Sequence, residues 1–166
     1  MSPISAVPII KDAGALVSPR LREIIALWRS LTPAGEFAPK REAIALSKVR
    51  GLAPWTWMID VVDGGADFRM RIAGERVIEF LGRRYAGTLL SDVKGEAFFD
   101  GMRLFCSRIA NTRSPLAIGP LPALHPGREY LEIEVLGLPL SQDGESVTGL
   151  FGGFDFRLKN TSFSTE

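Results

Sequence analysis

Apolar and polar residues alternate most regularly in the middle of the chain. Residues 67–72 place apolar side chains at every second position between charged ones, which is the period of a strand with one buried face. An apolar run at 57–62 precedes them, and Gly64-Gly65 lies between the two runs. Glycine adopts the positive φ that tight hairpin turns require. The pattern therefore predicts two paired strands, followed by a short helix that ends at Gly82.

A helical stripe of apolar residues lies closer to the N-terminus. Ser18 and Pro19 are typical of a helix start, as N-cap and first helical residue. The apolar positions that follow are spaced i, i+3, i+4 and i+7, so they share one face of the helix. That face must be buried, either against the sheet of the same chain or against the same helix of a second copy. For the second alternative, the candidate dimer-interface residues are Leu21, Ile24, Ile25 and Trp28.

The second half of the chain combines one longer helix with further strands. Residues 98–111 have helical apolar spacing, and we expect strands at 116–124, 130–140 and 146–157. Within the middle strand the apolar residues change from odd to even positions, which predicts a β-bulge beside Gly137. The order of elements indicates an α+β fold, in which an antiparallel sheet carries helices on one face and is preceded by an N-terminal helical extension.

Composition excludes several classes of protein. The chain has 166 residues, of which 46% are hydrophobic and 23% charged, as in an ordinary globular domain. Its net charge of +1 provides no field for nucleic acid or an acidic membrane surface. No apolar run approaches the roughly 18 residues of a membrane span. Residues 1–17 do not resemble a signal peptide, so we expect a cytoplasmic protein.

Candidate chemistry is sparse, and we expect no catalytic residue, metal or cofactor. The single cysteine, Cys106, and the single histidine, His125, cannot complete a metal site of the usual nitrogen and sulfur ligands. An enzyme remains an alternative, for instance one with a hot-dog-like fold and acyl-thioester chemistry. It would need these two side chains to meet within hydrogen-bond distance, with carboxylates such as Asp60, Asp63 and Glu134 available.

Several segments together carry a resemblance to a known family. They are residues 21–28 (LREIIALW), 57–62 (WMIDVV), 67–74 (DFRMRIAG), and Leu138-Pro139-Leu140 before Asp143-Gly144. In these segments, and in the order of its elements, the chain resembles a PAS domain, and in detail the small stand-alone bacterial PAS proteins. The resemblance spans roughly residues 21–156. It divides the chain into a flexible arm (1–17), an N-terminal helical extension (18–54), a PAS-like domain (55–157) and a C-terminal tail (158–166).

The resemblance implies small-molecule sensing, protein partnering and dimerisation rather than catalysis, although a fold alone does not define a function. Flavin photosensors of this fold carry a cysteine in an Asn-Cys-Arg context, which Cys106 lacks. Haem sensors commonly carry a histidine on the helix over the sheet, whereas His125 lies in a Pro-Gly turn. The resemblance therefore leaves either an apolar pocket for an organic ligand or a core filled by its own side chains. The candidate pocket residues are Trp57, Met70, Ile72, Phe105, Ile109, Ile133 and Phe151.

The function implied is that of a signalling or adaptor module. Few residues follow Phe156, so we expect its output to pass to a signalling protein in trans, with the chain itself forming a homodimer. Neither nucleic acid nor a membrane is expected as a partner. A purely structural dimerisation module is the remaining alternative.

Overall fold

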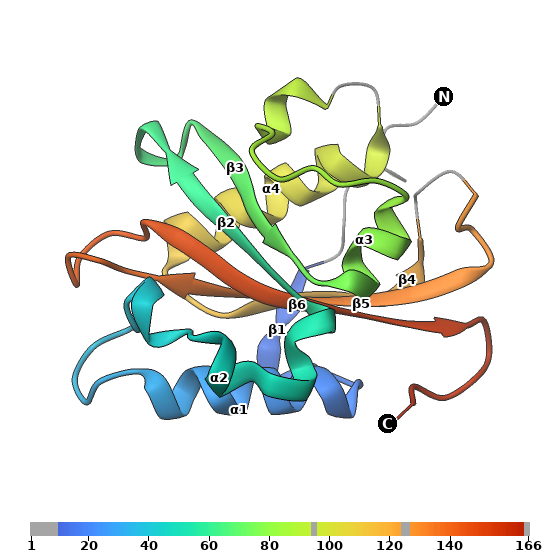
Figure 1. Cartoon of the computed structure of the whole chain (residues 1–166), viewed down its shortest axis with the longest axis horizontal. Helices are drawn as coiled ribbons and strands as arrows, with labels where there is room; N and C mark the ends of the chain where they lie inside the picture. The colour runs from blue at the N-terminus through green and yellow to red at the C-terminus, as the bar shows by residue number, and fades with distance from the viewer. Residues whose placement is uncertain (1–9, 94–95, 124–126, 165–166) are drawn as a thin grey trace.

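A six-stranded antiparallel sheet forms the centre of the protein, with helices on both of its faces (Figure 1). The computed structural model describes residues 10–93, 96–123 and 127–164. The strands lie in the order β1-β4-β5-β6-β2-β3. Their bounds are β1 (Ile10–Asp12), β2 (Thr56–Val62), β3 (Asp67–Ala73), β4 (Leu116–Pro122), β5 (Leu131–Leu140) and β6 (Gly149–Leu158). The predicted α+β class and antiparallel sheet are confirmed.

The helices divide between the two faces of the sheet. The longer ones are α1 (Pro19–Leu31) and α4 (Ala97–Thr112), and the shorter ones are α2 (Leu46–Val49) and α3 (Glu75–Leu81). Figure 1 shows α1 and α2 on one face, and α3 and α4 on the other. The local signals act as predicted: Ser18 Oγ accepts from the backbone N–H of Leu21, and Gly82 ends α3 with φ at 83°.

The apolar face of α1 packs against the sheet of its own chain. Its four buried apolar side chains lie in one hydrophobic cluster with the even-numbered leucines of β5 and Phe151 of β6. Trp28 also donates its indole N–H to the carbonyl oxygen of Pro139 at 2.9 Å. Of the two alternatives for this face, the structure has the intramolecular one. The candidate dimer-interface residues are thus already covered within one chain: Leu21, Ile24, Ile25 and Trp28.

Strand β5 is apolar at successive positions because both of its faces are buried. It pairs with β6 in continuous register along its whole length, so the β-bulge predicted beside Gly137 is wrong. Val135 packs on the side of α4, and Leu136 packs on the side of α1. The apparent change of parity is therefore the signature of a central strand between two helical layers. Gly137 has a different role, since a Cβ there would lie 2.4 Å from Cδ1 of Ile109.

The segment that precedes α1 adds an edge strand to the sheet. Residues 1–9 of the predicted arm lie outside the described residues, whereas β1 pairs with β4 at the edge of the sheet.

In the predicted C-terminal tail, Phe163 is buried, and the guanidinium of Arg157 lies over its ring at 4.6 Å. Within the described parts of the chain, no helix has the length and apolar character needed to cross a bilayer.

Candidate functional site

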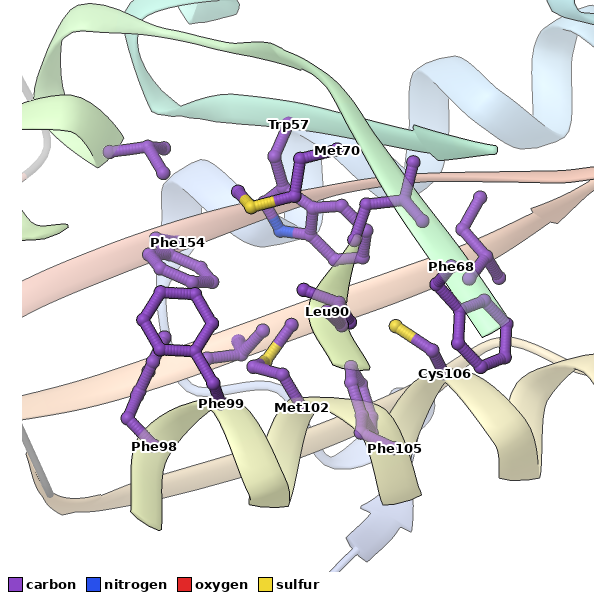
Figure 2. Close-up of a cluster of buried hydrophobic side chains, with 14 of the residues drawn as sticks. Trp57, Phe68, Met70, Leu90, Phe98, Phe99, Met102, Phe105, Cys106 and Phe154 are labelled. Carbon is purple, nitrogen blue, oxygen red and sulfur yellow. The ribbon is translucent and has the colours of Figure 1, made fainter. Parts of the chain in front are cut away.

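A small cavity lies between the sheet and the layer of α3 and α4. The buried faces of β2, β3 and β6 form its floor, and α3, α4 and the turn Leu90–Asp92 cover it. Figure 2 shows the α4 side chains directed toward the sheet, with Leu90 beside them. The lining residues are Trp57, Ile59, Met70, Val77, Leu81, Leu90, Phe98, Phe99, Met102 and Phe154.

Most of this core is filled by its own side chains. The free volume that remains is about 20 Å³, roughly the space of one water molecule. A buried water needs two to four polar partners, and this wall is almost entirely hydrocarbon and thioether. Met70 and Met102 contribute flexible, unbranched side chains, which re-pack more readily than branched or aromatic ones. An organic guest would need more space than this, and Met70 and Met102 are the lining side chains whose re-packing would provide it.

The Trp57 indole N–H is the unusual polar group of this core. Trp57 is 2% exposed, and within the described residues its Nε1 has no hydrogen-bond acceptor. The contrast with Trp28 is direct, because that indole donates to Pro139. Leaving a buried donor unpaired costs about 1–3 kcal/mol of folding free energy. The other lining side chains carry no nitrogen or oxygen, so no side chain of the wall can accept this hydrogen bond.

Two of the seven predicted pocket residues line the cavity, and three others lie close to it in the same core. Trp57 and Met70 form part of the wall. Phe105, Ile109 and Ile133 belong to the same buried cluster without lining the free space. These five residues lie on the α4 side of the sheet, as alternation and helical spacing predict.

Ile72 is the first of two pocket predictions that the structure corrects. Met58 pairs with Ile72, but Ile59 pairs with Met70, so Arg71 is an extra residue in β3. Such a bulge reverses the alternation of side chains beyond it. Ile72 consequently leaves the cavity face and is 53% exposed.

Phe151 is the second correction. It packs in the cluster beneath α1, on the opposite face of the sheet from the cavity. Its neighbour Leu150 and the more distant Phe154 belong to the cavity-side cluster. Successive side chains of a strand point to opposite faces. Assigning Phe151 to a face therefore requires knowing whether the odd-numbered or the even-numbered residues of β6 face α4.

The cover of the cavity includes residues that are not among the predicted pocket residues. Val77 and Leu81 are one helical turn apart on α3, and their spacing in the sequence places them on one apolar face. Leu90 lies in a turn within a connecting region without periodic pattern, and no signal in the sequence marks it as buried.

The residues of the enzyme alternative do not form a reactive group in the described structure. Cys106 is fully buried, and burial raises the pKa of its thiol, the opposite of what a nucleophile requires. His125 lies outside the described residues. Asp60 forms ion pairs with Arg41 and Arg71 at 3.2 and 3.0 Å. The described residues hold no group of three or more His, Cys, Asp and Glu side chains suited to a metal ion.

The site is thus a small apolar cavity between an antiparallel sheet and the helices that cover it. Comparison with protein families matches residues 16–154 to the PAS domain. The match covers most of the chain, so this chain belongs to the PAS domain family, whose members are signalling and sensory modules. The match begins at residue 16, and α1 therefore lies inside it.

Among solved structures, the chain is similar to the PAS domain of BvgS from Bordetella pertussis. The identity is 18% and the TM-score is 0.49, over 73% of this chain and 87% of that one. No curated protein matches the chain.

Proposed function

We propose that this PAS domain is a signalling module that binds a partner protein in trans and responds to a small organic ligand in the cavity under α4. The observation that carries the ligand part is the apolar cavity itself, whose wall holds a buried donor without an acceptor in the described parts of the chain. A core evolved only for stability gains by filling such space and pairing such a donor.

Helix α4 connects the cavity to the surface. Phe99 and Met102 line the cavity, whereas Leu104 of the same helix is 51% exposed. A ligand that displaces Met102 would therefore shift a helix whose other side faces possible partners. Packed cores transmit such shifts because their side chains interdigitate with little free space.

A homodimer is part of the same proposal. The apolar face of α1 is already buried, so a second copy or a signalling protein would need another surface. Large apolar side chains at least two-fifths exposed are available for this, namely Val17, Ile72, Leu104, Tyr130 and Leu158.

Native mass spectrometry of the full chain, followed by denaturation, tests the proposal. We expect a species of twice 18.1 kDa that releases a defined small mass on unfolding. Met102→Phe should fill the cavity and so reduce the fraction of protein that releases the ligand. Leu104→Phe, on the exposed side of α4, is the matched control. A ligand-free monomer, no thermal shift in a ligand screen and no partner in a pull-down would together overturn the proposal.

A further inference from the structure

We infer that the cavity takes a small, uncharged organic molecule with a hydrogen-bond acceptor that accepts from the Trp57 indole N–H. This rests on the ligand-binding part of the proposed function and specifies the chemistry of the ligand. The observation that carries it is a donor that is buried and has no acceptor among the described residues, in a side chain that lines the cavity.

The indole is held in one position by the strands around it. Trp57 pairs with Gly152 of β6, where a Cβ would lie 2.5 Å from Cζ2 of the indole and 2.0 Å from the carbonyl oxygen of Leu136. The absence of a side chain at Gly152 thus makes room for the ring. The edge of Phe154 also meets the indole, at 6.5 Å between ring centroids. The donor is consequently preorganised for a guest, which lowers the entropy cost of binding.

The wall selects against other ligand classes. No lining side chain carries a charge, so an ionised ligand would be desolvated without a counter-ion. A pure hydrocarbon would leave the Trp57 N–H unpaired. A lone water would find a single donor where it needs several partners. A neutral carbonyl, ether or hydroxyl compound satisfies both the apolar wall and the donor, with Met70 and Met102 adjusting to its shape.

A matched pair of probes tests the inference in the full-length protein. Cyclopentanone and methylenecyclopentane have nearly the same shape, but only the ketone accepts a strong hydrogen bond. Proton–nitrogen NMR resolves the indole N–H groups of the three tryptophans. We expect cyclopentanone to shift the Trp57 resonance saturably to higher frequency and to bind about tenfold more tightly than the alkene. The Trp28 resonance is the internal reference, since its N–H already donates to Pro139.

Two variants separate the hydrogen bond from packing. Trp57→Phe keeps an aromatic ring but removes the donor, so the two probes should then bind within about twofold of each other. Trp55→Phe is the matched control and should retain the preference, because that ring lies outside the cavity wall, under the guanidinium of Arg20 at 3.8 Å. Should Trp57→Phe fail to fold, the NMR comparison of the two probes on the unmodified protein tests whether the Trp57 N–H donates to the ketone.

Each contrary outcome has a distinct meaning. Equal binding of both probes to the unmodified protein, or a preference that survives Trp57→Phe, overturns the acceptor inference and leaves a ligand cavity. Failure of both probes to bind at millimolar concentration also overturns it. That failure leaves partner binding, which the pull-down tests, as the part of the proposed function still standing.

Discussion

Glu134 is a charged residue that the fold buries completely in the central strand β5. Its carboxylate accepts from Lys11 Nζ at 2.7 Å and from the backbone N–H groups of Val17 and Ser18 at 2.8 and 2.7 Å. It thereby fixes the segment between β1 and α1 to the sheet. A buried charge is tolerated only when it is paired in this way.

We expect Glu134→Gln to lower the free energy of unfolding by about 2–4 kcal/mol, measured by urea denaturation at pH 7. The amide places an NH₂ group against N–H donors and leaves the Lys11 ammonium without its carboxylate. Glu132→Gln, which breaks the more exposed pair with Arg157, is the control and should cost at most about 1 kcal/mol. Equal losses in the two variants would contradict a specific role for Glu134.

At the scale of elements, the turn between β5 and β6 is organised by Asp143. One carboxylate oxygen accepts from the backbone N–H groups of Glu145 and Ser146, both at 2.8 Å, and the other accepts from Ser146 Oγ at 2.7 Å. These bonds, that from Ser146 Oγ foremost, hold the pKa of Asp143 well below its ordinary value of 3.8. The ionised carboxylate is therefore the form that stabilises the turn.

The sign of the pH dependence follows from that depressed pKa. The stabilisation is fully present above the ordinary pKa and is lost as the pH falls toward the lower folded-state value. We expect Asp143→Asn to be less stable than the unmodified chain at pH 7, with the difference narrowing at pH 3, as measured by urea unfolding. Glu145→Gln leaves the backbone bonds of the turn in place and should show no such narrowing. A difference that stays constant with pH would count against this account.

At the scale of the whole molecule, the sheet separates two apolar layers, one under α1 and one under α4. Cys106 lies in the second layer with no exposed surface. A thiol reagent can reach it only after the structure opens, and burial also raises the pKa of the thiol, which suppresses the reactive thiolate. Its reactivity therefore reports how readily the cavity layer opens.

We expect Cys106 in the native protein to react with a disulfide reagent at least about a thousandfold more slowly than in the urea-unfolded chain. The rate is followed by the release of the coloured thiolate. A double variant, Cys106→Ala with Leu104→Cys, moves the thiol to an exposed site of α4 and should react promptly. If the native thiol reacted as fast as that exposed one, the core would not be closed as described.

Much of the fold could be predicted because its signals are local. The start of α1 at Ser18 and the end of α3 at Gly82 depend on backbone groups within a few residues, and such signals are visible in the sequence. The candidate site was predicted less completely. Trp57 and Met70 follow from alternation, whereas Leu90 has no periodic neighbours that would reveal its burial.

The amino-acid sequence by itself determined most of the elements, the antiparallel sheet and the resemblance to PAS domains, because periodicity, caps and turns act over a few residues, whereas β1 was visible only in the tertiary structure. Only the tertiary structure decided which face each side chain meets. One extra residue in β3 sends Ile72 to the surface, and the parity of β6 sends Phe151 beneath α1. Likewise, that the Trp57 indole has no acceptor among the described residues depends on which distant side chains pack around it, and spacing along the chain does not encode that.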